Sequence, residues 1–175
     1  PGAETRLDAL DFGIPQSIGE FAVTAFPTSH DAPGSCGFRL DAAGGAVGVL
    51  TDTGYVTDEA ADILEGVDLA VLEANHDIET LRSGPYPYYL KQRILGAQGH
   101  LSNEDAARFA AVLAQSGTSE IILAHLSREN NTPAIAQTAV ERALSAAGVS
   151  PLLSVAPRDC LGPAHTVSRR SVCRR

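Results

Sequence analysis

Histidines and carboxylates stand at or just beyond the ends of apolar segments in this sequence, and such side chains can bind divalent metal ions. The residues of interest are His30, Asp52, Glu73, His100 and His125. Imidazole and carboxylate ligands together suit zinc, manganese or iron, and one carboxylate can bridge two ions through its two oxygens. Each residue alone also has an ordinary explanation, because a histidine at a strand end is usually a hydrogen-bonded structural residue. As a set, they indicate a metal site.

Short apolar segments precede most of these residues and are expected to be strands. Alternating apolar and small polar residues predict a half-buried strand at 21–26. A hairpin is predicted from strands at 37–41 and 46–51, joined by a turn at 42–45. Further strands are predicted at 68–72, 121–124 and 152–156. Because the carboxyl ends of strands in an open α/β sheet meet at one edge, where sites assemble, we expect the metal-binding candidates to converge there.

Helices are predicted between these strands, at 58–64, 87–95, 102–113 and 133–147. The third has the clearest signals, because Ser102 is a candidate N-cap with Asp105 three residues later, and apolar residues follow at helical spacing. Gly148 suits the C-cap of the last helix. Since strands and helices alternate through the second half of the chain, the fold class is α/β.

The composition is that of an ordinary globular domain. Of 175 residues, 44% are hydrophobic and 19% charged, and no apolar run approaches the length that spans a bilayer. The net charge of -8 does not favour a polyanionic partner, since nucleic-acid binding depends on Lys and Arg. The basic cluster is terminal, and we interpret it as a solvated tail rather than a phosphate-binding one: Arg169, Arg170, Arg174 and Arg175.

The cysteines and the first residue bear on the origin of the chain. Cys36, Cys160 and Cys173 show no C-x-x-C spacing, so we expect a reducing, cytoplasmic setting and no zinc–thiolate site. The chain begins with Pro1 and contains no methionine, so we expect that the native N-terminus is missing. The lack of a visible secretory leader then says nothing about targeting.

A series of short motifs, in a fixed order, makes the chain resemble a known family. The motifs are P-T-S-H-D-A (27–32), T-D-T-G (51–54), L-E-A-N-H-D (72–77), G-H-L-S-N (99–103), A-H-L-S-R-E-N-N (124–131) and A-P-R-D (156–159). The series resembles the WalJ/YycJ-type metallo-β-lactamase-fold hydrolases, whose wider relatives include ribonuclease Z and phosphodiesterases of the same fold.

The resemblance implies a site with two divalent metal ions, zinc or manganese. His30 matches the histidine that completes the shell of the first ion, Asp52 the bridging carboxylate, and His125 the histidine of the second ion. His76 and Asn131 belong to the pattern as residues that orient the ligands.

Glu73 and His100 match a carboxylate–histidine pair near the scissile group, in which the histidine is a proton donor. The pairing is sensible physically, because a carboxylate fixes the tautomer of an imidazole and supports its protonated form. The alternative is that His100 has only a structural role beside the helix N-cap.

One departure from the family pattern is large. The motif H-x-H-x-D-H, which supplies the remaining ligands, is absent, and in the family it lies upstream of the segment that contains His30. We therefore expect residues 1–162 to be the C-terminal part of one αββα sandwich domain, contributing one mixed sheet with its outer helices, and residues 163–175 to be a basic tail. A degenerate relative that has lost the motif is the alternative.

The resemblance implies a metal-dependent hydrolase in which a hydroxide held by two ions attacks a phosphodiester, with an exonuclease acting on nucleic acid as the first hypothesis. The chain alone is then expected to be inactive, and its partners are the nucleic-acid substrate and the missing N-terminal half. Two alternatives remain. One is a small-molecule hydrolase of the same fold, acting on a thioester, lactone or cyclic phosphodiester. The other is a non-catalytic interaction module.

Overall fold

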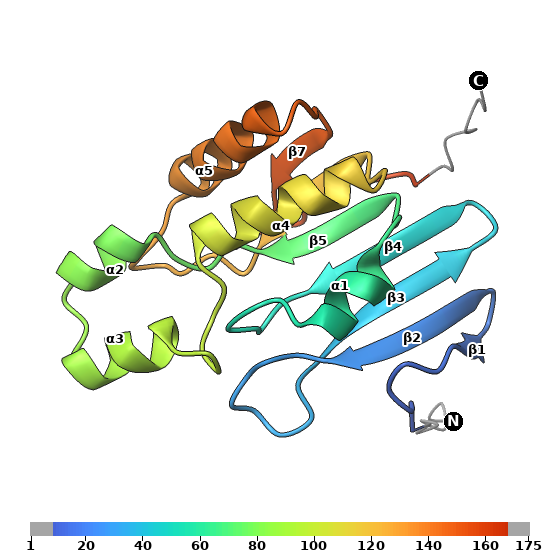
Figure 1. Cartoon of the computed structure of the whole chain (residues 1–175), viewed down its shortest axis with the longest axis horizontal. Coiled ribbons are helices and arrows are strands. Elements are labelled where there is room, and N and C mark those ends of the chain that lie inside the picture. The colour runs from blue at the N-terminus through green and yellow to red at the C-terminus, as the bar shows by residue number, and fades with distance from the viewer. Residues whose placement is uncertain (1–8, 168–175) are drawn as a thin grey trace.

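The computed structural model describes residues 9–167 and places the strands in a single mixed sheet (Figure 1). The strands are β1 (Gln16–Ile18), β2 (Phe21–Pro27), β3 (Cys36–Ala42), β4 (Gly45–Leu50), β5 (Leu69–Glu73), β6 (Glu120–Ala124) and β7 (Leu152–Val155). The helices are α1 (Asp58–Leu64), α2 (Ile78–Ser83), α3 (Tyr88–Leu95), α4 (Asn103–Gln115) and α5 (Pro133–Ala146). The predicted α/β class, with one mixed sheet and helices, is confirmed.

The order of strands in the sheet follows the order in the chain, from β1 to β7. The pairs from β1 to β4 are antiparallel, and the pairs from β4 to β7 are parallel. As a result β2, β4, β5 and β6 all run in the same direction. Their carboxyl ends share one edge of the sheet, the edge at which α2 and α3 lie (Figure 1).

The hydrophobic core lies between one face of the sheet and the helices α1, α4 and α5. Leu50, Leu72 and Leu123 point into it from β4, β5 and β6, and each is at most 1% exposed. Leu64 of α1 and Leu113 of α4 pack against the same cluster. Gly48 allows the close approach of α1, because a Cβ at this position would lie 2.4 Å from Leu64 Cδ2.

The second face of the sheet is also apolar. The strand register places Phe38, Val49, Val71 and Ile122 in one row across β3 to β6. Three of these side chains are half-buried, and Ile122 is 8% exposed. Within residues 9–167, the helices α1, α4 and α5 pack on the first face and leave this row uncovered. A chain that contributes one sheet of a sandwich would have such a face.

The predicted elements match the structure well, with two omissions. The helix at 58–64 is observed with those bounds, and Ser102 is the N-cap of α4, accepting a hydrogen bond from Asp105 N at 3.1 Å. The short edge strand β1 and the helix α2 were not predicted. For α2 a signal was present, because Asp77 is an N-cap that accepts from Thr80 N at 2.8 Å.

Other element ends differ from the prediction by one or two residues. The hairpin turn is tighter than expected, since β4 already begins at Gly45, and α5 ends at Ala146. Residues 163–167 contain neither helix nor strand, while the predicted basic cluster and Cys173 lie outside the described residues. Across residues 9–167, no helix combines the length and apolar character needed to cross a membrane.

The two faces of β5 provide a test of this arrangement in the 175-residue chain. Val71→Thr is expected to change the free energy of unfolding by less than about 1 kcal/mol, because the new hydroxyl can reach water. Leu72→Thr is expected to cost about 2–5 kcal/mol, because it leaves a cavity and buries a hydroxyl in the core. Urea unfolding measures both. Equal costs for the two variants would show that the second face is covered.

Candidate metal centre

All the predicted site residues meet at the edge where β2, β4, β5 and β6 end. His30, Asp52 and His125 lie in the loops that leave these strands, Glu73 is the last residue of β5, and His100 lies just before α4. The ring centroids of His30 and His100 are 4.8 Å apart, and those of His100 and His125 are 5.2 Å apart. The structure thus brings together residues that are far apart in the sequence, as expected.

The carboxylate of Glu73 positions two of the histidines in this cluster. It is fully buried, and its Oε1 accepts from both His100 Nδ1 and His125 Nδ1 at 2.8 Å. Its Oε2 accepts from Thr53 N at 2.9 Å. Burial by itself would raise the pKa of the Glu73 carboxyl, but the hydrogen bonds from His100, His125 and Thr53 outweigh it and lower that pKa. Glu73 is therefore an anion held by three N–H donors.

These hydrogen bonds fix which nitrogen of each histidine is free. A carboxylate without a proton only accepts, so His100 and His125 both carry a proton on Nδ1. Their Nε2 atoms remain for other partners. The hydrogen bond to Glu73 also raises the pKa of His125, against the opposing effect of burial. His30 is oriented in the same way, since its Nδ1 donates to the carbonyl of Gly99 at 2.8 Å.

Asp52 and His125 have unusual backbone conformations. Their φ angles are 55° and 57°, in the left-handed region that residues other than glycine rarely adopt. The neighbouring contacts hold these conformations. Thr53 N donates to Glu73, and Asn75 Nδ2 donates to the carbonyl of His125 at 2.9 Å. Strained backbone of this kind concentrates at functional sites, and here it occurs at two of the three predicted metal ligands.

The donor atoms around Asp52 are spaced as ligands of a metal ion. Asp52 Oδ1 is 3.9 Å from His30 Nε2 and 3.7 Å from His125 Nε2, both too long for hydrogen bonds. Two ligands about 2.1 Å from a tetrahedral zinc would be about 3.4 Å from each other, so the observed spacing is only a few tenths of an ångström wider. Imidazole nitrogens with a shared carboxylate therefore fit the divalent ions that the sequence predicts.

Distances alone would also admit His100 as a ligand. The ligand atoms of His30, Asp52 and His100 lie within 4.8 Å of one another, and so do those of Glu73, His100 and His125. Glu73 is poorly placed to bind an ion, because N–H donors already occupy both of its oxygens. His100 Nε2, by contrast, is free to bind an ion or to transfer a proton.

Supporting residues that the sequence analysis missed surround the cluster. Thr53 and Asn75 tie the loops after β4 and β6 to β5, as described above. Asn131, which the motif series already includes, donates from Nδ2 to the carbonyls of Ala74 and Asn75, at 2.8 and 3.1 Å, and so holds the backbone that follows β5. In the sequence, the signal that could have identified Asn75 was the group of polar residues directly after an apolar strand. The structure shows that these residues are buried.

His76 is placed differently from expectation. It is 1% exposed, and neither ring nitrogen has a hydrogen-bond partner in the part of the chain that the structure describes. Burial lowers its pKa from 6.5 to about 4. The interaction with Glu73 acts in the opposite direction but is smaller. The neutral ring is thus enclosed beside the site, without the hydrogen bond through which a residue orients a ligand.

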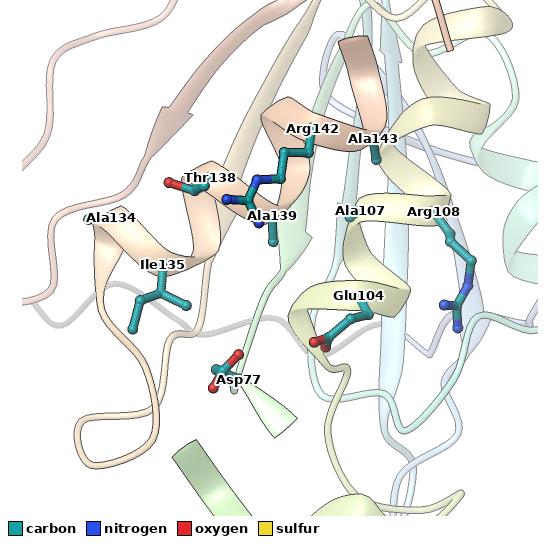
Figure 2. Close-up of a pocket in the computed structure, with 10 residues that line it drawn as sticks. All are labelled: Asp77, Glu104, Ala107, Arg108, Ala134, Ile135, Thr138, Ala139, Arg142 and Ala143. Atoms are coloured by element: carbon teal, nitrogen blue, oxygen red, sulfur yellow. The ribbon is translucent and has the colours of Figure 1, made fainter. Parts of the chain in front are cut away.

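Two cavities border the cluster, and others lie apart from it. A cavity of about 250 Å³ adjoins His30 and His100, and another of about 840 Å³ adjoins His125 and is lined by Arg128 and Arg158. A third, of about 720 Å³, lies between α4 and α5 and is lined by Ala107 and Ala139 together with charged residues such as Glu104 and Arg142 (Figure 2). None of the candidate site residues lines this third cavity.

Comparison of the sequence with known proteins identifies relatives. Residues 2–126 match the family described as the β-lactamase superfamily domain. Exodeoxyribonuclease WalJ of Streptococcus pneumoniae serotype 2 (strain D39 / NCTC 7466) is 42% identical over 138 residues, which are 79% of this chain and 51% of the relative. Exodeoxyribonuclease YycJ of Bacillus anthracis is 38% identical over 136 residues, which are 78% and 52% of the two chains. The chain spans about half the length of these relatives.

Solved structures share the fold at low sequence identity. A diphosphatase from the PhnP family superposes with a TM-score of 0.55 at 14% identity, covering 89% of this chain and 48% of the other. Zn(2+)-bound PqqB from Methylobacterium extorquens superposes with a TM-score of 0.54 at 18% identity, covering 84% and 52%. These similarities concern the fold alone, and again about half of each other structure is matched.

The enclosed ring of His76 predicts how stability depends on pH. In the unfolded chain this histidine takes up a proton as the pH falls below 6.5, whereas in the folded chain it stays neutral down to about 4. Stability should therefore fall as the pH drops from 6.5 to 4, by up to about 3 kcal/mol from this residue. Above pH 6.5 the residue should add no pH dependence.

The matched variant is His76→Gln, which keeps a similar volume and does not titrate. Urea unfolding of both proteins between pH 4 and pH 8 isolates the contribution of His76, because every other titratable residue is the same in both. The same slope in both proteins would mean that the ring is accessible to protons in the folded state.

Proposed function

Because the chain belongs to the β-lactamase superfamily, we propose that it forms part of a metal-dependent hydrolase that cleaves phosphodiester bonds in DNA as an exonuclease. The observation that carries the proposal is the convergence of His30, Asp52 and His125 around donor spacings that suit metal ions. The substrate class rests on the relatives, which are named exodeoxyribonucleases.

In this proposal His30 and His125 would each hold one divalent ion through Nε2, and Asp52, which lies between the two histidines, would be shared. The left-handed backbone at Asp52 and His125 directs these side chains away from the sheet and toward each other. Bound ions in such a site activate water and stabilise the negative charge that develops on a phosphate group. The contribution of the protein is to hold the donors at fixed spacing before the ions and the substrate arrive.

We assign proton transfer to His100. Its Nδ1 is committed to Glu73, so its Nε2 is the atom that can donate a proton to the leaving oxygen as the P–O bond breaks. The Glu73 carboxylate orients the ring by accepting this hydrogen bond. Glu73 contacts both His100 and His125 through the same oxygen, so proton donor and metal ligand share one anchor.

A small-molecule hydrolase with the same site is the main alternative. The broad cavity beside His125, with Arg128 and Arg158 at its wall, favours a polyanionic substrate that extends beyond the reacting bond. The net charge of -8 over the whole chain acts against such a substrate. A comparison of turnover on single-stranded DNA, on a thioester and on a lactone separates these hypotheses.

A non-catalytic interaction module is less consistent with the site. Left-handed backbone at a non-glycine residue costs of the order of 1–3 kcal/mol, and this occurs at both Asp52 and His125. An interaction surface has no need of strained residues that direct imidazole and carboxylate groups into one cluster. A site that binds ions does have such a need.

Ligand count leads us to propose that this chain provides about half of the site. A catalytic zinc has about three protein ligands in addition to water. Here each ion would have one histidine and a share of Asp52. The remaining ligands would come from an H-x-H-x-D-H motif, which this sequence does not contain.

One prediction of this proposal concerns Asp52 in the full-length protein. Asp52→Ala should remove both metal binding and activity, because it deletes the donor shared by two ions. The control is His76→Gln, which should reduce activity by no more than the roughly 10–100-fold that is typical when a residue outside the ligand set is changed. Metal content by atomic spectroscopy and hydrolysis rate are measured for both variants. Equal losses of activity with unchanged metal content would show that Asp52 is not the bridge.

Another prediction of this proposal concerns the 175-residue chain by itself. It should bind two equivalents of Zn²⁺ or Mn²⁺ only weakly and hydrolyse no phosphodiester, because most of both coordination shells is missing. Calorimetric titration and a phosphodiesterase assay are the measurements, with the longer protein containing H-x-H-x-D-H as positive control. Tight binding of two equivalents together with turnover by the chain alone would refute the half-site proposal.

A further inference from the structure

The cavity of about 250 Å³ beside the cluster has a wall that the proposed chemistry does not use. Its inner side is formed by His30, His100 and Gly99, and its outer side by Tyr86, Leu90 and Ile94 on α3 and the loop before it. We propose that this cavity binds a single nucleoside of the DNA strand, with the base against Tyr86. The inference rests on the proposed function and specifies how its substrate is held.

The chemistry of the outer wall suits a nucleobase. Tyr86 is half-buried and offers an aromatic surface, while Leu90 and Ile94 provide apolar contacts. Stacking on an aromatic side chain holds any base, because every base has a π-face. The size agrees, since about 250 Å³ lies just below the roughly 300–1,000 Å³ of cavities that hold drug-sized ligands. The cavity has room for one nucleoside rather than a longer segment.

Polar atoms at the inner end can meet the base or the sugar. Asn75 is 8% exposed, and its Nδ2 is committed to the carbonyl of His125, which leaves Oδ1 as an acceptor at the cavity. Ser127 Oγ accepts from Asn130 N at 3.2 Å, which leaves its hydroxyl hydrogen as a donor. The lining thus combines apolar and aromatic side chains with placed polar atoms, as small-molecule sites do.

The wall is fixed to the site rather than loosely attached. Arg93 of α3 pairs with Asp31, with Nε–Oδ2 at 2.6 Å and Nη2–Oδ1 at 3.0 Å, and this contact lowers the pKa of Asp31. His100 N also donates to the carbonyl of Ile94 at 3.1 Å. Gly99 is required for this approach, because a Cβ there would lie 2.2 Å from Ile94 O. These contacts set the distance between Tyr86 and the histidines.

The position of His100 places the bound nucleoside on the side of the leaving group. When water adds to phosphorus and the P–O bond breaks, the electron pair stays on the sugar oxygen, and the proton from His100 Nε2 neutralises it. A nucleoside in the cavity that His100 lines would carry that sugar oxygen. Room for a single nucleoside, and not for a longer segment, is how a site would select the end of a strand.

The test combines a change of the tyrosine with removal of the base from the substrate, as in a double-mutant cycle, and it uses the full-length protein. Tyr86→Ala, Tyr86→Phe and the control Tyr89→Ala are compared with wild type; Tyr89 is 75% exposed and lines none of the three cavities described above. The substrates are a single-stranded oligodeoxynucleotide and two versions with an abasic residue at the 5′ or the 3′ end.

If the base stacks on Tyr86, Tyr86→Ala lowers kcat/KM about 10-fold on the normal strand, while Tyr86→Phe and Tyr89→Ala leave it nearly unchanged. With the abasic residue at one of the two ends, Tyr86→Ala should have no further effect. An equal loss on all three substrates would show that Tyr86 only supports the fold of the wall. No loss on any substrate would show that the base lies elsewhere. Either result overturns the proposal.

A second measurement separates this proposal from the proposed function. Binding of deoxythymidine monophosphate is followed by NMR in wild type and Tyr86→Ala, without turnover. If wild type hydrolyses a thioester but no DNA, the exonuclease assignment fails. The binding measurement still tests whether the cavity holds a nucleoside. Binding that is lost in Tyr86→Ala and kept in Tyr89→Ala supports the nucleoside site. Equal binding in both variants, or none in wild type, refutes it.

Discussion

A buried carboxylate needs hydrogen-bond donors, and most of the site follows from how Glu73 obtains them. An unpaired anion in the core would be very costly, and here its donors are His100, His125 and the backbone of Thr53. These donors come from three loops that are far apart in the sequence. Burying one negative charge at the end of β5 therefore requires the three loops to meet above it. Asp52 is positioned as a consequence, because its neighbour Thr53 is one of the donors.

The sheet provides the rigidity that this arrangement needs. The strands β4, β5 and β6 are short, parallel and apolar, and their carboxyl ends lie in adjacent register. The strand β6 passes directly into His125, and β4 ends two residues before Asp52; both of these residues have a left-handed backbone. The packed core keeps the strand ends in place. Its stability offsets the free-energy cost of the two strained residues. Gly54 and Gly99 then let the loop before α4 approach closely, because a Cβ at either position would lie within 2.3 Å of a backbone atom.

Much of this was predictable from the sequence, for reasons that differ between elements. The helices α1 and α4 have caps and apolar periodicity that are local signals, and both were predicted. The strand β1 has three residues at the edge of the sheet and too little pattern to identify it. The candidate residues were found because they follow apolar segments and match a motif series. The sharing of one Glu73 oxygen by His100 and His125 depends on the register between β5 and β6 and on the path of the loop before α4, so no sequence pattern contains it.

The balance of charge explains why metal ions would be essential for binding an anionic substrate here. The net charge of the chain is -8, and both Asp52 and Glu73 lie within the cluster. Two of the nearby cations are paired with carboxylates, Arg93 with Asp31 and Arg128 with Asp159, while Arg158 contacts the carbonyls of Leu126 and Ser127. A phosphate group approaching this edge without ions would meet carboxylates whose charge is only partly offset by histidines. Two divalent ions would reverse the sign of the local field, since bound cations are often the largest charges in such a site. The groups that hold the ions would then also be the groups that make binding of the anionic substrate depend on those ions.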